Sequence, residues 1–355
     1  MQMSRSSLST VLVLTVLAAL VFCAPAFADS LAVKKAEAAR VEAQIAALNT
    51  KAEIASERYN AARERYNELN DKIDATERKI AKLNKRTHTL QTHLNTRARD
   101  MYRDGPAGFM SVLLSVRSFE DFDATIRVLK SLNEQDAATV AQLKAAKASA
   151  QEARATLVTA RVEAGRQKTA MASNAQAVKA RLAARKELLA GLTSEIQTLI
   201  AQKIAQQKAA DQARLMAQLL RQRSAASGGI ILGGDPPTSS KAAAAVYWAE
   251  KQIGKPYVWA AAGPDTFDCS GLMVFAYGKV GIGLSHYSGA QINEGSPVSR
   301  DNLQPGDLVF FGSPIHHVGM YAGGGNFIEA PYSGTDVRIT ELSSRGDFAG
   351  ASRPQ

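Results

Sequence analysis

Cysteine is almost absent from this chain of 355 residues, which has only Cys23 and Cys269. Cys23 lies in an N-terminal stretch typical of an export signal, so Cys269 is the only thiol expected in the processed protein. A single thiol excludes an internal disulfide, and it argues against a zinc site built on cysteines. Cys269 is therefore either an inert small side chain or a reactive thiol.

The sequence also lacks an apolar run long enough to span a bilayer. Its longest run, residues 11–22, is interrupted only by Thr15 and is shorter than the ~20 residues that a spanning helix needs. Arg5 precedes this run and Ala26-Phe27-Ala28 follows it, so residues 1–28 are predicted to be a cleaved signal peptide. We therefore expect a protein that is secreted or acts in the cell envelope, outside the cytoplasm.

Proline and glycine are scarce in the first part of the chain. Between residues 29 and 227 there is one proline, Pro106, and four glycines, whereas 21 of the 25 glycines come later. This division predicts three parts after the signal peptide, because long helices avoid both residue types. They are a helical coiled-coil hairpin at 29–223, a linker at 224–240 and a mixed domain at 241–355.

Charge divides the chain at the same place. Residues 1–240 carry a net charge of +12, and residues 241–355 carry a net charge of −2. The positive part is expected either to bind anionic envelope polymers or to be an ordinary solvated helical surface. No nucleic-acid partner is expected.

An apolar repeat runs through the first helical part. Apolar and small residues alternate four and three apart from Val41 to Leu94, and Arg97 and Met101 continue the same steps. A repeat of this length predicts a coiled coil, since only supercoiling keeps such a seam against a partner helix. Weaker repeats predict a second helix from about Asp121 to Arg223, and therefore an antiparallel hairpin.

The first helix is expected to end at Gly105-Pro106, which interrupts the repeat. Dense apolar residues follow, up to Phe122 and beyond. They either close the end of the hairpin or form a docking surface for a partner. The candidate docking residues are Phe109, Leu113 and Phe119.

Residues 241–355 are predicted to form an α+β domain, with helices first and an antiparallel sheet after them. One helix is expected from Lys241 to Gly254, and a second begins at Cys269, where Asp268 can cap it. The thiol then lies at the positive end of a helix, which favours the thiolate. Three strands are expected at residues 307–311, 317–321 and 326–330.

Two of these strands bring suitable partners for the thiol. If residues 322–324 form a three-residue hairpin loop, His317 lies directly opposite Glu329, and Val318 lies opposite Ile328. A carboxylate beside an imidazole orients it and stabilises its charged form. Cys269, His317 and Glu329 would then be nucleophile, base and orienting group. The alternative is that Glu329 is a solvated strand residue, because one residue of slip would separate the pair.

Four blocks of this domain resemble the NlpC-type cell-wall cysteine peptidases, which have a compact papain-like fold. The blocks occur in the family's order and are Pro256-Tyr257-Val258-Trp259, Phe267-Asp268-Cys269-Ser270-Gly271-Leu272, residues 303–311 and His317-Val318-Gly319-Met320-Tyr321. The resemblance implies hydrolysis of the peptide stem of peptidoglycan, commonly between D-glutamate and the diamino acid that follows it. It implies Cys269 as nucleophile, His317 as base and Glu329 as the third polar residue. Tyr257, Asp268, Ser270 and Ser288 are further candidates for oxyanion or substrate contacts. No metal or cofactor is expected.

The sequence departs from the family pattern at three places. Glu329 stands where histidine is frequent, but a carboxylate can do the same orienting work. Leu284-Ser285-His286-Tyr287-Ser288 lacks the proline and arginine that many members have before the serine. Trp259 is followed by Ala260-Ala261-Ala262-Gly263 and not by the immediate glycine that is usual in the family. The departure at residues 284–288 leaves the details of the substrate open, and the one after Trp259 is expected to alter the wall of the cleft.

The helical part resembles the coiled-coil domain of secreted division hydrolases of the PcsB type, which are held inactive until they engage the FtsE–FtsX membrane complex. We therefore expect an exported peptidoglycan hydrolase of cell division or wall remodelling, whose coiled coil masks the Cys269 cleft. In this hypothesis Ile230-Ile231-Leu232 of the linker latches the domain in place. The alternative is a scaffold or adaptor at the envelope, with a catalytically minor or acyl-transferring papain-like domain.

Overall fold

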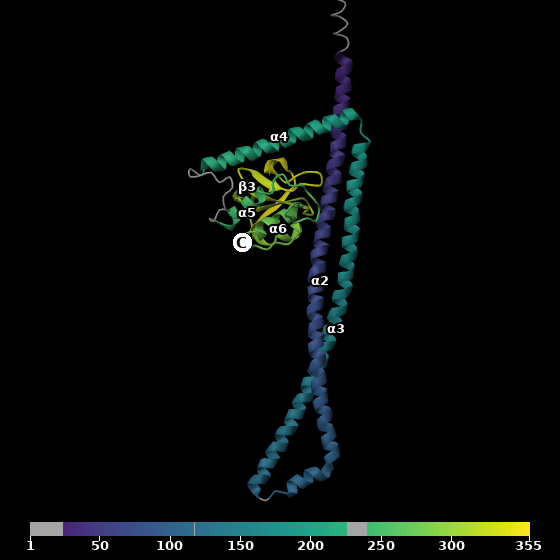
Figure 1. The fold of residues 1–355 in the computed structure, drawn as a ribbon, viewed down its shortest axis with the longest axis vertical. Coiled ribbons are helices and arrows are strands. Elements are labelled where there is room, and N and C mark those ends of the chain that lie inside the picture. The colour runs from purple at the N-terminus through teal and green to yellow at the C-terminus, as the bar shows by residue number, and fades with distance from the viewer. Residues whose placement is uncertain (1–23, 117, 226–239) are drawn as a thin grey trace, which may run out of the picture. The chain divides into compact units, whose positions relative to one another are not determined.

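The computed structural model describes residues 24–116, 118–225 and 240–355 (Figure 1). Most of the predicted signal peptide, and Ile230-Ile231-Leu232 of the predicted linker, lie outside these residues. The described chain begins with three helices, α2 (Ala24–Leu114), α3 (Phe119–Ala190) and α4 (Ser194–Ala225). Within the described residues, no helix combines the length and the apolar character that crossing a membrane requires.

The chain forms two compact units. One contains the residues up to Glu64 together with those from Ala170 onward, and the other contains residues 65–169. In the second unit α2 and α3 run antiparallel, since Leu69 of α2 packs with Ala160 and Ala164 of α3. In the first unit the start of α2 packs in the same manner against the end of α3 and the start of α4. The predicted antiparallel coiled coil is confirmed.

Two predictions about these helices are wrong in detail. Gly105 does interrupt α2, with a φ of 59°, but a helix resumes at once and continues to Leu114. Pro106 explains this, because its missing N–H and fixed φ suit the first turn of a helix. The expected continuous helix from residue 121 to 223 is broken at residues 191–193, where Gly191 follows the end of α3.

The apolar seam also ends earlier than predicted. The seam residues of α2 are buried or half-buried as far as Leu94 and Arg97, whereas Met101 is 62% exposed. The four-and-three spacing therefore continues in the sequence beyond the last residue that is packed.

The remainder of the chain is an α+β domain whose sheet has six antiparallel strands in the order β1-β6-β2-β3-β4-β5. Helices come first and strands follow, as predicted. The helices are α5 (Lys241–Glu250), α6 (Cys269–Gly278) and α7 (Ser288–Gln291), with short turns η1 (Arg300–Asn302) and η2 (Leu342–Ser344). The strands are β1 (Gly295–Pro297), β2 (Leu308–Phe311), β3 (His317–Gly323), β4 (Asn326–Glu329), β5 (Arg338–Glu341) and β6 (Phe348–Pro354).

Helices α5 and α6 cover one face of this sheet (Figure 1). Leu272 and Met273 of α6 are fully buried against this face, which includes Phe310 and Val318. The other face has its own apolar cluster around Phe311, with Phe327 and Leu342. Because β2 is buried on both faces, its run of large apolar residues shows no alternation.

The β3–β4 hairpin has a different register from the one predicted. Met320 pairs with Ile328 and Gly323 pairs with Asn326, so the turn contains only Gly324 and Gly325. All three glycines from Gly323 to Gly325 have positive φ, which favours this tight turn. The shift amounts to two residues, and side chains alternate with a period of two. His317 and Glu329 therefore remain on one face as diagonal neighbours, although they are not opposite each other.

Candidate active site

Cys269 is the first residue of α6 and is almost completely buried. The carboxylate of Asp268 caps this helix, accepting a hydrogen bond from the Gly271 N–H at 2.7 Å. Gly271 has to be a glycine, because a Cβ there would lie 2.1 Å from the Ala261 carbonyl oxygen. Burial, together with the nearby carboxyl groups of Glu57 and Asp268, raises the pKa of the Cys269 thiol well above its usual value. In this structure the nucleophile candidate is therefore a protonated thiol.

His317 begins β3 and pairs with Glu329 at the end of β4. Its Nε2 donates a hydrogen bond to Glu329 at 2.8 Å, and both side chains are buried. Burial lowers the pKa of His317 despite this hydrogen bond, so the neutral imidazole is favoured. The other nitrogen, Nδ1, is buried and has no hydrogen-bond partner among the described residues. A neutral imidazole that donates from Nε2 has its lone pair on Nδ1, where it can take up a proton.

Glu329 is held as a carboxylate by several donors. Its Oε1 accepts hydrogen bonds from the Thr340 hydroxyl at 2.6 Å and from Arg338 at 3.1 Å. Arg345 lies 3.7 Å from the other oxygen. Burial alone would raise the pKa of Glu329, but the hydrogen bond from His317 and the charge of Arg338 hold it well below its usual range. The prediction that Glu329 accompanies His317 agrees with this geometry, although its predicted register was wrong.

A second imidazole–carboxylate pair lies beside the thiol. Asp268 Oδ1 is 2.8 Å from His286 Nε2, and Asp268 Oδ2 accepts a hydrogen bond from the Ala260 N–H at 2.8 Å. Sequence reasoning noted His286 and Ala260 only as departures from a family pattern. In the structure Asp268 joins them, and both belong to the wall of the Cys269 site.

The site is occupied by a side chain from α2. Glu57 is buried, and its Oε2 accepts hydrogen bonds from the N–H and the hydroxyl of Ser288, each at 2.5 Å. Its Oε1 accepts a hydrogen bond from the Ser270 hydroxyl at 2.8 Å and lies 3.7 Å from the Cys269 sulfur, whose thiol points to it. Burial raises the pKa of Glu57, and the neighbouring charge of Asp268 adds to this effect. Ser270 and Ser288 thus form a cradle for a carboxyl group next to the nucleophile candidate.

Two further residues on the same face of α2 continue this contact. The side-chain amide of Asn60 donates a hydrogen bond to Asp268 at 3.0 Å. Arg63 donates to the Ala260 carbonyl oxygen at 3.2 Å, and another of its nitrogens lies 2.6 Å from His286 Nδ1. We call Glu57, Asn60 and Arg63 the polar face of α2.

Sequence reasoning missed this polar face, although a signal for it exists. Asn49, Glu53, Ser56, Asn60 and Arg63 recur four and three apart, as the seam residues do, but one position further along. Glu53 is buried as well, which raises its pKa to about 8. A second stripe at the same spacing indicates a second packed face of the helix.

The remaining predicted site residues divide into two groups. Burial raises the pKa of Tyr257 well above its usual value, and the next contributor is the adjacent Cys269, so this tyrosine is close to the thiol as expected. Of the predicted docking residues, Phe119 is 84% exposed. The side chains of Phe109 and Leu113 lie outside what the structure describes.

The described residues thus contain a papain-like domain with a thiol at a helix start and a buried imidazole–carboxylate pair. Residues 254–347 match the sequence profile of the NlpC/P60 family, and residues 80–153 match the coiled-coil domain of peptidoglycan hydrolase PcsB. The chain therefore contains a segment similar to NlpC/P60 family domains, and before it a segment similar to the PcsB coiled coil.

Two relatives each match about a quarter of this chain. A probable endopeptidase p60 of Listeria grayi is 48% identical over 91 residues, which are 25% of this chain and 18% of that protein. The peptidoglycan endopeptidase RipA of Mycolicibacterium smegmatis is 41% identical over 109 residues, 27% of this chain and 22% of that protein. The matched part thus spans about a fifth of each relative. The crystal structure of the NlpC/p60 domain of peptidoglycan hydrolase SagA is 36% identical, with coverage of 31% of this chain and 97% of that one and a TM-score of 0.30.

Proposed function

We propose that this protein is an exported cysteine endopeptidase that cleaves the peptide stem of peptidoglycan, acting in the cell envelope without a metal or cofactor. One observation carries the proposal above the others. The buried His317 donates from Nε2 to Glu329 and keeps Nδ1 without a partner among the described residues, while Cys269 begins a helix that packs against the strand of His317. Cys269 thus has the position of a nucleophile, and His317 has the position of a general base that Glu329 orients.

The proposed reaction begins when His317 Nδ1 takes the proton of Cys269. The thiolate attacks the amide carbonyl carbon, and N–H groups at the start of α6, with the Tyr257 hydroxyl, stabilise the oxyanion. As the C–N bond breaks, protonated His317 gives its proton to the leaving amine. Water then attacks the thioester with His317 again as base, which releases the acid and restores the thiol. Glu329 stabilises the imidazolium in both halves of the reaction.

For the substrate, we propose the D-glutamyl–diamino acid bond that the family resemblance suggests. The geometry around Glu57 supports a substrate with a free carboxylate close to the cleaved amide. Ser270 and Ser288 already hold a carboxyl group beside the thiol, with three donors directed at it. A substrate carboxylate would take the place of Glu57, while Asp268 holds the helix start.

We further propose that α2 keeps the enzyme closed. Glu57 fills the place next to the sulfur, and it diverts the thiol proton away from His317. The carboxyl groups around the thiol also raise its pKa. Closure is thus both steric and electrostatic, and hydrolysis requires that this stretch of α2 leaves the site.

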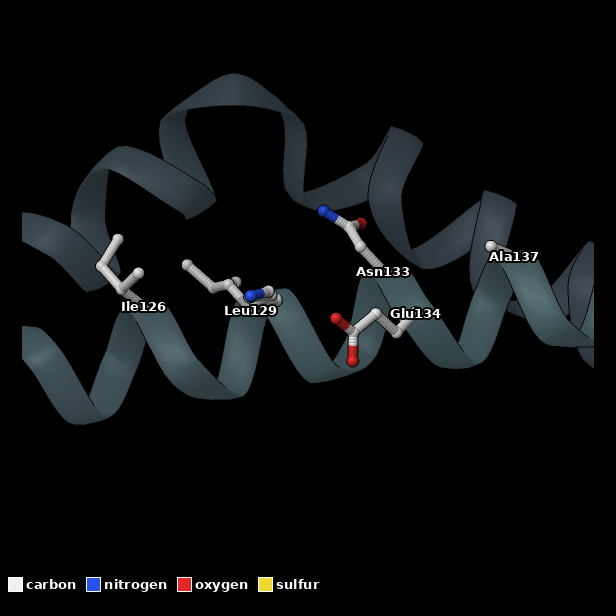
Figure 2. A pocket seen from close by; sticks show the side chains of 6 residues that line it. Ile126, Leu129, Asn133, Glu134 and Ala137 are labelled. Carbon is white, nitrogen blue, oxygen red and sulfur yellow. The ribbon is translucent and has the colours of Figure 1, made fainter.

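A membrane partner would supply the opening force during cell division. The exposed apolar side chains near the turn between α2 and α3 support docking there, and Phe119 is one of them. Beside them a hollow of about 460 Å³ opens along α3, where Ile126 and Leu129 project from the helix (Figure 2). We propose an FtsE–FtsX-type complex as the partner and anionic envelope polymers as a weaker one.

Mass spectrometry of digested peptidoglycan tests the function. The chain with Glu57→Ala should release stem fragments with a new D-glutamyl end, and Cys269→Ala or His317→Ala in that chain should abolish release. Glu329→Gln should leave reduced turnover, because the imidazole is less well oriented. Intact stems from the opened chain would favour the scaffold, whereas products lengthened by a transferred amine would indicate acyl transfer.

A further inference from the structure

The contact of Arg63 points to a second recognition element of the cleft, distinct from the carboxylate cradle. Its guanidinium has only donors, so the two atoms that receive it, the Ala260 carbonyl oxygen and His286 Nδ1, both act as acceptors. We call these two atoms the acceptor pair. We propose that the acceptor pair binds a protonated primary amino group of the substrate, and that Arg63 occupies its place in the closed protein.

The tautomer of His286 follows from its two neighbours. Nδ1 faces a guanidinium that can only donate, so it carries the lone pair and Nε2 carries the proton. Nε2 is 2.8 Å from Asp268 Oδ1, an acceptor suited to that proton. Asp268 thereby fixes the orientation in which His286 presents an acceptor to the cleft.

The backbone of Ala260 is held in an unusual conformation. Its φ is 61°, and among the described residues it is the only non-glycine with positive φ. Such a conformation is unfavourable for a residue with a Cβ and persists only where the surroundings enforce it. Here Asp268 Oδ2 accepts the Ala260 N–H at 2.8 Å, while the carbonyl of the same residue receives Arg63. Asp268 thus holds both members of the acceptor pair.

The side chain of Arg63 is also packed against an aromatic residue of α2. The Tyr59 ring lies under the Arg63 guanidinium, 5.7 Å from its carbon, and packs edge-on against Trp259 of the cleft wall at 5.0 Å. Arg63 is therefore inserted between an aromatic ring and two acceptors. A protonated amine carries the same charge and also has only donors.

The spacing on α2 defines the ligand further. Glu57 and Arg63 are six residues apart, which is about 9 Å at 1.5 Å per residue. The cleft therefore offers donors for a carboxylate beside the sulfur, and it offers acceptors for an amine at a separate place, less than two helical turns further along α2. This inference rests on the proposed stem-peptide substrate, where the amine belongs to the diamino acid side chain or to the peptide N-terminus.

The binding of stem peptides to a catalytically inactive variant tests the inference separately from turnover. The full chain from Asp29 would carry Cys269→Ala, which prevents hydrolysis, together with Glu57→Ala and Arg63→Ala, which free both places. Calorimetry would compare three synthetic stem peptides: one with both amines free, one acetylated on the diamino acid side chain and one acetylated on the N-terminus. One of the two acetylations should weaken binding roughly tenfold or more, because it removes a charged donor.

His286→Arg in the same protein should abolish that preference, since it replaces an acceptor by a cation. Asn293→Arg, on an exposed position of the neighbouring turn, adds the same charge elsewhere and should leave the preference intact. Equal affinities for the three peptides, no binding of any peptide, or an unchanged preference in His286→Arg would overturn the inference. Hydrolysis by the Glu57→Ala, Arg63→Ala chain with Cys269 intact is measured in parallel. Turnover without amine preference refutes only this inference, whereas amine-selective binding without turnover refutes only the proposed function.

Discussion

Two stretches of the helix α2 carry the same four-and-three repeat but have different surroundings. From residue 49 to 63 the seam is buried or half-buried, and the polar side chains of Glu53, Glu57 and Asn60 beside it are buried as well. From residue 83 to 97 only the seam is half-buried and the charged positions between its residues are exposed. The comparison teaches that a charged helix face has two possible roles, which sequence spacing alone does not separate. In the first stretch the polar face binds a thiol site, and in the second it is solvated.

The largest effect is expected from removing the carboxyl group of the polar face. Glu57→Ala deletes the acceptor of three hydrogen bonds from Ser270 and Ser288, which should destabilise the closed arrangement by roughly 3 kcal/mol. Hydrolysis of peptidoglycan by the full chain should then rise about a hundredfold. The matched control is Glu68→Ala, an exposed glutamate further along α2, which should leave the rate unchanged. An equal rise in both variants would show that the effect does not come from the contact of Glu57 with the Cys269 site.

Low pH should stabilise the contact of residues 49–63 with the Cys269 site, whereas it should not affect residues 83–97. Burial raises the pKa of Glu53 to about 8 in the closed arrangement from an ordinary value of 4.5, against an opposing effect of Arg345 and with smaller effects of Glu329, Asp347 and Glu57. Its contribution to closure is therefore complete below about pH 4.5 and is lost as the pH rises through 8. The raised pKa of Glu57 acts in the same direction.

Glu53→Gln should accordingly weaken the increase of the hydrolysis rate with pH between about pH 4.5 and 8. The measurement is the ratio of hydrolysis rates of variant and parent at each pH, which cancels the titration of the catalytic groups. A ratio that does not change with pH would contradict the role of Glu53.

A smaller effect is expected at Asn60. Its amide donates to Asp268 at 3.0 Å and lies 3.4 Å from Glu57, so it bridges two carboxyl groups. Asn60→Ala should raise hydrolysis about tenfold, since one hydrogen bond to a charged group is lost. Asn60→Asp should open the site further through like-charge repulsion, and a fall in its rate would be evidence against the bridge.

The smallest effect is expected in the second stretch. Arg97 and Asp136 form an ion pair whose side chains are 35% and 27% exposed. Asp136→Ala should change the free energy of unfolding by less than about 1 kcal/mol and leave hydrolysis unchanged. Chemical denaturation followed by circular dichroism measures the first quantity. An increase in hydrolysis would show that closure depends on the whole coiled coil.

Local chemistry in the sequence was enough to predict several features. Gly105 ends the first helix segment, Asp268 caps α6, and His317 and Glu329 share a face of the sheet. The pair survived an incorrect hairpin register because the error was two residues, the period of side-chain alternation.

Features that depend on tertiary packing were not predictable in this way. Gly191 was visible as an isolated glycine, but glycine inside a helical pattern does not by itself fix a break. Glu57 and Arg63 look like ordinary charges of a solvated helix, and their partners lie more than 190 positions away in the sequence. Their role becomes visible only when Ser270, Ser288 and His286 are brought beside them.

The most direct test of the central claim, that α2 closes the Cys269 site, is the rate at which a small alkylating reagent modifies this thiol. In the chain from Asp29 onward Cys269 is the only cysteine, so loss of free thiol reports on it alone. We predict slow alkylation of the parent chain at neutral pH, because the thiol is buried and its pKa is raised. Glu57→Ala should accelerate alkylation about a hundredfold, and Glu68→Ala should not. Alkylation of the parent chain at the rate of an exposed thiol, or equal rates in the parent and in Glu57→Ala, would contradict the claim.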